Sequence, residues 1–171
     1  STPLYSSAAS DVYKRQLQTV GRDETIAVAD LVDEVLVDLE PLAQEKEIKL
    51  VGNCKDITMI GSDILIYRMV YNLVENAIKY NRFGGQVTVT AYQKGKNICL
   101  SVEDTGSGIP DELKERVFEP FFRVDKSRSR ELGGVGLGLA LVREIVRVHD
   151  GSITVQSGSS GGTVFDVVFT Q

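Results

Sequence analysis

The residues with the clearest chemical potential are two asparagines and a lysine near the middle of the 171-residue chain. Asn72 and Asn76 are four residues apart, so on a helix their side chains project from the same side. Amide oxygens at this spacing can bind a hard divalent cation, and Lys79 adds a positive charge along the same line. Solvated asparagines on an ordinary helix are the alternative interpretation, which the pattern alone leaves open.

The segment from Asp104 to Ile109 is a second candidate, because it combines an aspartate with glycines at Gly106 and Gly108. Glycine permits tight backbone turns and the close approach of a ligand, so Asp104 could accept a hydrogen bond from the amino group of a base. An aspartate-led turn that only reverses the chain before Pro110 explains the same residues equally well.

A glycine-rich run from Gly133 to Gly138 leads directly into a predicted helix. Backbone N–H groups and the positive end of the helix dipole could there bind phosphate oxygens, and a flexible connector is the alternative. The run lacks the GxxxxGK[ST] pattern of P-loop proteins and the strand and acidic residue of a Rossmann site.

A basic stretch lies between the aspartate and the glycine run. This part of the sequence has four basic residues, Arg123, Lys126, Arg128 and Arg130, and only two acidic ones, Asp125 and Glu131. Loops of this length in compact domains are often lids, although a solvated loop fits as well. The preceding aromatic residues are expected to anchor such a lid or to be ordinary core residues: Phe118, Phe121 and Phe122.

Hydrophobic periodicity predicts the elements that hold these segments. Ser62 and Asp63 offer an N-cap for a long helix that ends near Tyr80, and Pro41 should bend the helix that contains it. Helices are expected over Ile26 to about Lys46, Asp63 to Tyr80, Ile109 to Phe118 and Leu137 to His149, and strands over Ile48 to Val51, Ile57 to Ile60, Val87 to Ala91, Ile98 to Val102, Ser152 to Gln156 and Thr163 to Phe169.

Composition narrows the function classes. The net charge of −5 gives no general attraction to nucleic acid, so an anion must be bound by a local arrangement. Cys54 and Cys99 form no CxxC pair, which indicates buried thiols in a reducing, cytoplasmic setting. No apolar run is long enough to span a bilayer, so no membrane contact is expected of this segment, and anchoring of the parent protein is left open. Residues 1–22 are expected to be a disordered leader or a remnant of an upstream segment, and residues 23–171 one catalytic domain.

Four segments, taken in order, resemble the N, G1, F and G2 boxes of histidine kinase catalytic domains. They are Asn72-Leu-Val-Glu-Asn76-Ala-Ile-Lys79-Tyr80, Asp104-Thr-Gly-Ser-Gly108-Ile, Phe118-Glu-Pro-Phe121-Phe-Arg123-Val-Asp125 and Gly134-Val-Gly136-Leu-Gly138-Leu. Gly161-Gly162-Thr163 is similar to the final box of these domains, and the match covers about residues 24 to 170. The resemblance implies an α/β fold, the Bergerat ATP-binding fold. This fold is a two-layer sandwich with helices packed on one face of a mixed, mostly antiparallel sheet.

The resemblance also implies a role for each matching residue. Asp104 is expected to accept the adenine amino hydrogen, and Asn76 to hold Mg²⁺ with Asn72 nearby. Lys79 is expected to contact phosphate and Arg123 to approach the γ-phosphate, so that Asn76, Lys79 and Arg123 form the catalytic set. Such a site suits phosphoryl transfer, which depends on positioning and charge stabilisation. The other expected contacts with ATP or ADP are Tyr80, Gly106, Gly108, Ile109, Phe118, Gly134, Val135, Gly136, Leu137, Gly138 and Thr163.

The same resemblance implies a sensor histidine kinase of a two-component system, with a response regulator downstream. The acceptor histidine of such a kinase lies in a helical hairpin before the catalytic domain. His149 ends the last predicted helix, where it is expected to cap the helix, so the acceptor must come from a hairpin absent from this chain. A nucleotide-sensing module without kinase activity is the alternative. An ATPase clamp of the wider superfamily is disfavoured, because it needs a catalytic glutamate at the position of Asn72.

Overall fold

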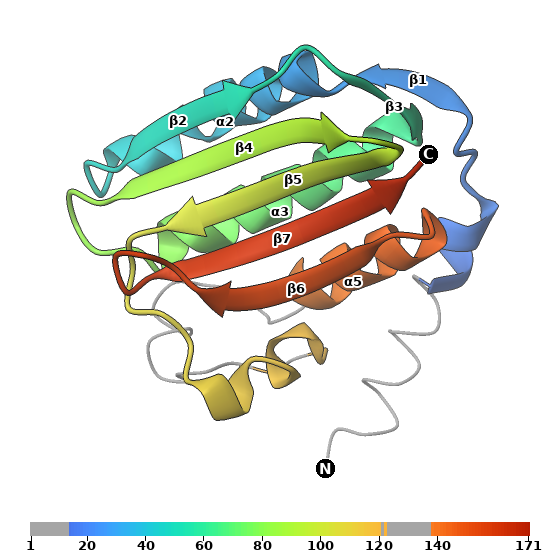
Figure 1. Ribbon diagram of the computed structural model, residues 1–171. Coiled ribbons are helices and arrows are strands. Elements are labelled where there is room, and N and C mark those ends of the chain that lie inside the picture. The colour runs from blue at the N-terminus through green and yellow to red at the C-terminus, as the bar shows by residue number, and fades with distance from the viewer. Residues whose placement is uncertain (1–13, 121, 123–137) are drawn as a thin grey trace.

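The computed structural model describes residues 14–120, 122 and 138–171, and Figure 1 shows its two layers. The main sheet has the strand order β2-β4-β5-β7-β6, in which β2 is parallel to β4 and the other neighbours are antiparallel. A short two-stranded sheet pairs β1 with β3. The strands are β1 (Glu24–Ala27), β2 (Lys49–Cys54), β3 (Thr58–Gly61), β4 (Gln86–Lys94), β5 (Asn97–Asp104), β6 (Ser152–Ser157) and β7 (Thr163–Thr170).

Three long helices, α2 (Val28–Gln44), α3 (Asp63–Lys79) and α5 (Gly138–Val148), lie on the same face of this sheet (Figure 1). The predicted two-layer α/β sandwich with a mixed, mostly antiparallel sheet is therefore confirmed. None of the helices in the described ranges is both long and apolar enough to cross a bilayer.

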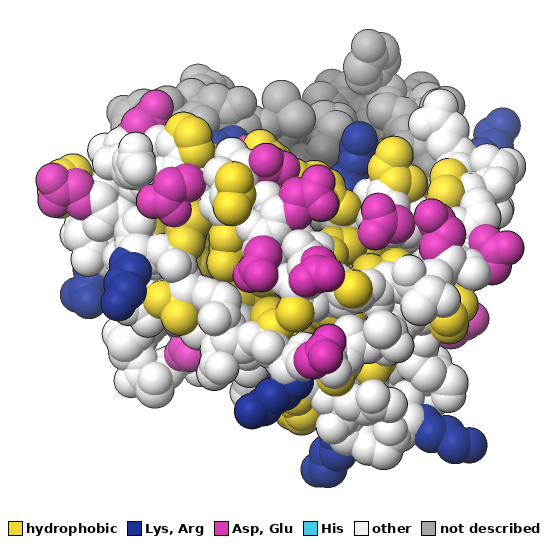
Figure 2. Space-filling model, turned by 90° about the horizontal axis from the view of Figure 1, so that it is seen from above, with side chains coloured by type: hydrophobic (Ala, Val, Ile, Leu, Met, Phe, Trp, Pro, Cys, Tyr) yellow, Lys and Arg dark blue, Asp and Glu magenta, His cyan; other side chains and the backbone are white. Residues whose placement is uncertain are grey.

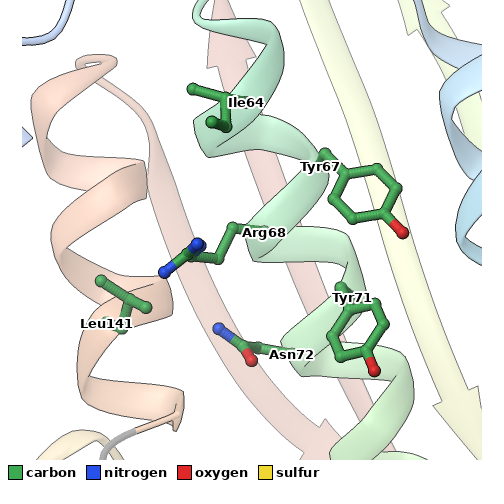
Figure 3. Close-up of a pocket in the computed structure, with 6 residues that line it drawn as sticks. All are labelled: Ile64, Tyr67, Arg68, Tyr71, Asn72 and Leu141. Atoms are coloured by element: carbon green, nitrogen blue, oxygen red, sulfur yellow. The ribbon is translucent and has the colours of Figure 1, made fainter.

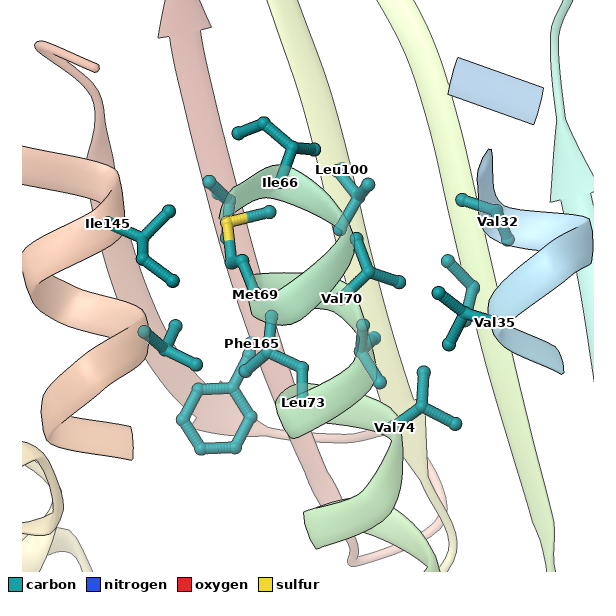
Figure 4. Packing of buried hydrophobic residues seen from close by; sticks show 14 of the residues in the cluster. Val32, Val35, Ile66, Met69, Val70, Leu73, Val74, Leu100, Ile145 and Phe165 are labelled. Atoms are coloured by element: carbon teal, nitrogen blue, oxygen red, sulfur yellow. The ribbon is translucent and has the colours of Figure 1, made fainter. Parts of the chain in front are cut away.

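The core forms between the helices and the sheet because the strands alternate in burial. In β5, and in β4 as far as Ala91, every second residue is buried, and these residues point toward the helices. Central helix α3 presents Met69, Val70 and Leu73 to this layer, and α2 and α5 add Val35 and Ile145 at its two sides (Figure 4). A polar-apolar alternation in the strands and an apolar stripe on α3 thus specify one shared core.

Helix α3 has the N-terminus that its sequence predicts. Ser62 is extended, and its hydroxyl oxygen accepts a hydrogen bond from the N–H of Leu65. The helix ends at Lys79, with Tyr80 as its C-cap. Helix α3 carries Asn72, Asn76 and Lys79, so its position in the fold determines where these side chains lie.

Helix α2 begins later than predicted, because residues from Glu24 to Ala27 form β1 instead of a first helical turn. Its outer side is acidic: Figure 2 shows the Asp and Glu side chains that gather on this face of the molecule, with few Lys or Arg among them. Such a face is unsuited to binding a polyanion. The exposed acidic residues of α2 are Asp30, Asp33, Glu34, Asp38 and Glu40.

Two further predictions require correction. The helix expected from Ile109 to Phe118 is replaced by two single 3₁₀ turns, η1 (Asp111–Leu113) and η2 (Arg116–Phe118). This segment buries only Val117 and Phe118, and adjacent buried residues do not make the stripe that an α-helix needs.

Residues 14–19 are helical, which contradicts the disordered leader but not the alternative, a remnant of an upstream segment. Leu17 is buried in the core, and Lys14 lies 3.8 Å from Glu144 of α5. One apolar side chain per turn is too weak a signal to predict this docked helix. Residues 1–13 lie outside the described part.

Candidate nucleotide site

Asp104 is the buried acidic residue of the site. It ends β5 on the core face, with 6% of its surface exposed. Its Oδ1 atom accepts hydrogen bonds from the N–H groups of Gly106 (2.8 Å) and Thr163 (3.3 Å). Within the described residues, Oδ2 has no hydrogen-bond partner. Burial raises the pKa of this carboxyl above its ordinary value, although the two N–H donors act in the opposite direction. A buried carboxylate with one free oxygen can accept a hydrogen bond from a ligand amino group.

Glycines allow three separate segments to meet around Asp104. A Cβ atom at Gly106 would lie 2.5 Å from the carbonyl oxygen of Tyr80, and one at Gly162 would lie 2.0 Å from that of Asp104. Gly108 has a φ of +77°, and a Cβ there would lie 2.7 Å from the carbonyl oxygen of Gly161. These glycines therefore allow close contacts between segments of the protein backbone. The sequence pattern instead predicts that they allow the close approach of a base.

Asn81 links the end of α3 to the strands, and sequence reasoning did not select it. The residue is 1% exposed, and its Nδ2 donates to the carbonyl oxygen of Gln86 at 3.0 Å. Its Oδ1 accepts from the N–H of Arg82 and from the hydroxyl of Thr105. The Thr105 hydroxyl oxygen also accepts from the N–H of Gln86. This network fixes Thr105, the neighbour of Asp104, against the residue that follows Tyr80.

Lys46 completes the C-terminal end of α3 and was also missed. Its ammonium group donates to the carbonyl oxygens of Ile78 (3.1 Å), Lys79 (2.9 Å) and Asn81 (2.7 Å). The last carbonyls of a helix have no partner within the helix, and a cation at this end also interacts favourably with the helix dipole. Because Lys46 lies more than thirty residues before its partners, no local sequence pattern could have revealed the contact.

The polar face of α3 carries the predicted asparagines. Asn72 and Asn76 are half-buried, and Lys79 forms an ion pair of 3.6 Å with Glu75 one turn earlier. Asn72 also lines a groove of about 440 Å³ between α3 and α5 (Figure 3). The groove is lined by Ile64, Tyr67, Arg68, Tyr71, Asn72 and Leu141. The amide oxygens suit a hard cation whose other ligands are phosphate oxygens and water. No cluster of three His, Cys, Asp or Glu residues in the described ranges could hold a metal by itself.

The structure brings together Tyr80, Asp104, Gly106, Gly108 and Thr163 through the backbone contacts and hydrogen bonds around the Asp104 carboxylate. Phe118 is placed in the core, where its ring meets the ring of Phe165 edge-on at 6.0 Å, and Ile109 packs at the margin of the same core. Gly138 is the first residue of α5. Several predicted residues of the site and of the basic stretch lie outside the described residues: Phe121, Arg123, Lys126, Arg128, Arg130, Gly134, Val135, Gly136 and Leu137.

His149 follows the last residue of α5 and has a structural position. The N–H of Ser62 donates to its Nε2 at 3.0 Å, so the ring is neutral and its Nδ1–H donates to the carbonyl oxygen of Ile145. Its ring also meets Phe169 edge-on. Burial lowers the pKa of this imidazole, and Arg22 contributes in the same direction. The bond to Ile145 caps α5 as predicted, and the bond from Ser62 also connects this helix end to the N-cap of α3.

Comparison with known proteins agrees with this geometry. Residues 61–171 match the family described as histidine kinase-, DNA gyrase B- and HSP90-like ATPases. The sensor histidine kinase RppB of Synechocystis is 37% identical over 140 residues, which are 81% of this chain and 31% of RppB. The chain therefore spans about a third of the length of this relative.

Solved structures give the same result. The catalytic domain of the histidine kinase ThkA has a TM-score of 0.78 and 27% identity, over 88% of this chain and 96% of that domain. ThkA in complex with the response regulator protein TrrA matches with a TM-score of 0.73 and 26% identity, over 86% of this chain and 41% of ThkA. The chain belongs to the family of histidine kinase-, DNA gyrase B- and HSP90-like ATPases, and within it to the ATP-binding catalytic domains of histidine kinases.

Proposed function

We propose that this domain binds ATP with Mg²⁺ and transfers the γ-phosphoryl group to a histidine on a helical hairpin supplied outside the chain. The observation that carries the proposal is the Oδ2 atom of Asp104. It belongs to a buried carboxylate whose Oδ1 is occupied by backbone N–H groups, so it is the oxygen left to bind an adenine amino group. Asn76 lies one helical turn before Tyr80, and the Tyr80 backbone lies beside the Asp104 segment.

The described residues support a division of roles. Tyr80 contributes one side of the base-binding region, since its carbonyl oxygen lies against Gly106. Asn76 would hold Mg²⁺ with Asn72 nearby, and the metal would neutralise charge on the phosphate oxygens. In this proposal Lys79 contacts phosphate, and its ion pair with Glu75 weakens when the nucleotide binds. The roles of Arg123 and of the glycine run from Gly134 to Leu137 remain predictions from the sequence.

The proposed partners follow from the relatives. The acceptor histidine would lie on the dimerisation hairpin, and a response regulator would receive the phosphoryl group afterwards. ThkA, to which this chain is similar, has been solved in complex with a response regulator. His149 is unsuited to the acceptor role, because both of its ring nitrogens are engaged in hydrogen bonds inside the fold.

Calorimetry with ADP and Mg²⁺ tests the nucleotide site. We expect binding to the wild-type chain and a loss of at least tenfold in affinity for Asp104→Asn, since the amide presents donors where an acceptor is needed. Glu103→Gln is the matched control, because the neighbouring carboxylate lies on the opposite face of β5 and should leave affinity unchanged. Equal affinities for wild type and Asp104→Asn would refute the assignment of the base-binding residue.

A second experiment tests catalysis. The chain is mixed with the hairpin of its parent protein and with ATP labelled on the γ-phosphate. We expect label on the histidine of the hairpin and none on His149. If nucleotide binds but no label reaches the hairpin, the kinase activity is refuted and a nucleotide-sensing module becomes the better assignment.

A further inference from the structure

Arg68 is a basic residue in the groove between α3 and α5, and the proposed division of roles does not use it. It precedes Asn72 by one helical turn, and Figure 3 shows its guanidinium group and the Asn72 amide pointing into the same space, toward Leu141 of α5. Residues four apart lie on one side of a helix, so Arg68, Asn72 and Asn76 form a continuous row. The row extends from the base-binding end of α3 into the groove.

The charge of Arg68 is not used inside the described part of the fold. No carboxylate there pairs with it, and no acidic side chain lines the groove. Neighbouring cations on α3 and α5 are engaged: Lys79 pairs with Glu75, Arg147 pairs with Glu144, and the Arg143 guanidinium lies 5.9 Å from the centre of the Phe118 ring. Arg68 is exposed, so its guanidinium group is free to meet an anion that enters the groove from solvent.

Distance along the helix indicates which part of a nucleotide would meet Arg68. Eight residues separate it from Asn76, which corresponds to about 12 Å along the helix axis. In the proposed function, a nucleotide whose base lies against Asp104 and whose metal lies at Asn76 would extend its phosphates toward Asn72, the next amide of the row. The terminal phosphate is the group farthest from the base, and it is the one that a long side chain from Arg68 could reach.

We propose that Arg68 binds the γ-phosphoryl group and makes the site prefer a nucleoside triphosphate over a diphosphate. The inference rests on the proposed function and adds a specificity-determining residue to it. The planar, charged guanidinium can donate two parallel hydrogen bonds to phosphate oxygens. Glutamine is shorter and neutral, so it cannot replace this interaction.

Calorimetry with two nucleotides tests this role in the chain itself. With Mg²⁺ present, we expect the wild type to bind a non-hydrolysable ATP analogue more tightly than ADP. Arg68→Gln should weaken binding of the analogue by about tenfold to a hundredfold and leave ADP affinity unchanged, because a charged hydrogen bond to phosphate is lost. Arg68→Lys should retain part of the preference. Arg147→Gln, an exposed arginine on α5, is the control and should change neither affinity.

The outcomes separate the two claims. If ADP binds and the ratio of the two affinities is the same in wild type and Arg68→Gln, the role of Arg68 is refuted and the nucleotide site stands. A wild type that binds both nucleotides equally also refutes it, as does an Arg68→Gln variant that loses both affinities together. If the wild type binds neither nucleotide, the proposed function fails and this inference fails with it.

Discussion

The backbone of Gly162 lies directly against Asp104: a Cβ atom on Gly162 would lie 2.0 Å from the Asp104 carbonyl oxygen and 2.8 Å from its Oδ1. The contact joins the end of β5 to the loop between β6 and β7. The N–H of the next residue, Thr163, then donates to the Asp104 side chain. The position of the Asp104 carboxylate therefore depends on a segment almost sixty residues further along the chain.

Gly162→Ala should destabilise the domain by about 1–3 kcal/mol, because the added methyl group meets backbone that cannot rotate away. Urea unfolding measures this loss, and ADP binding should weaken with it. Gly138→Ala is the control for stability, since a Cβ there has nothing within 4 Å among the described atoms. If both variants unfold at the same urea concentration, the packing argument is wrong.

Asp104→Asn should lose nucleotide binding without losing stability. The pKa of Asp104 is raised in the folded state, so the folded protein holds this proton more tightly than the unfolded chain, whose carboxyl titrates near 3.8. Ionisation then costs the folded state stability as the pH rises above 3.8, and the cost is complete above the folded pKa. At pH 7 the variant should therefore be at least as stable as wild type in urea. A clearly less stable variant would show that the Asp104 charge contributes favourably.

His149 should make stability depend on pH in the opposite direction. Its pKa is lowered in the folded state, so the unfolded chain binds the proton more readily below the ordinary value of 6.5. The stabilising effect of the neutral ring is thus fully present above pH 6.5 and is lost as the pH falls through the folded pKa. The charges that act on the ring are those of Arg22, which lowers the pKa, and Asp150, which raises it.

The test compares unfolding of wild type and His149→Leu between about pH 5 and pH 8. The advantage of the wild type should shrink as the pH decreases. A constant difference, or one that grows toward low pH, would contradict the neutral ring that accepts from Ser62 and donates to Ile145.

Lys46→Met should destabilise the domain by about 1–3 kcal/mol, because three carbonyl oxygens at the end of α3 lose their charged donor. Methionine has about the length of the apolar part of the lysine side chain, so lost packing contributes little. Lys94→Met, at an exposed position at the end of β4, should change the free energy of unfolding by less than about 0.5 kcal/mol. Equal effects of the two substitutions would mean that the helix end does not depend on Lys46.

Sequence reasoning could predict the parts of this domain that depend on neighbours in the chain. Helix α3, its N-cap and strands β4 and β5 all follow from local sequence patterns, and the structure confirms them. The Asp104 segment could be selected from the sequence because its glycines and aspartate lie close together. The packing of these glycines against protein backbone could not be predicted.

Lys46 and Asn81 could not be predicted in this way. Each makes its contacts through a tertiary arrangement, and a lysine or an asparagine in a turn normally indicates only exposure to solvent. Phe118 had two interpretations in the sequence because burial of an aromatic residue is decided by what packs on it. Here that is Phe165 of β7.

The turn between β4 and β5 lies at the end of β5 away from Asp104. Its Gly95 has a φ of +62°, and a Cβ atom at this position would have no described atom within 4 Å. Extra residues inserted there would leave the pairing of Asp104 with Val87 untouched. The turn is thus a suitable place to attach a fluorescent or affinity tag, whereas a single residue added inside β5 would put Glu103 in place of Asp104 at the proposed nucleotide site.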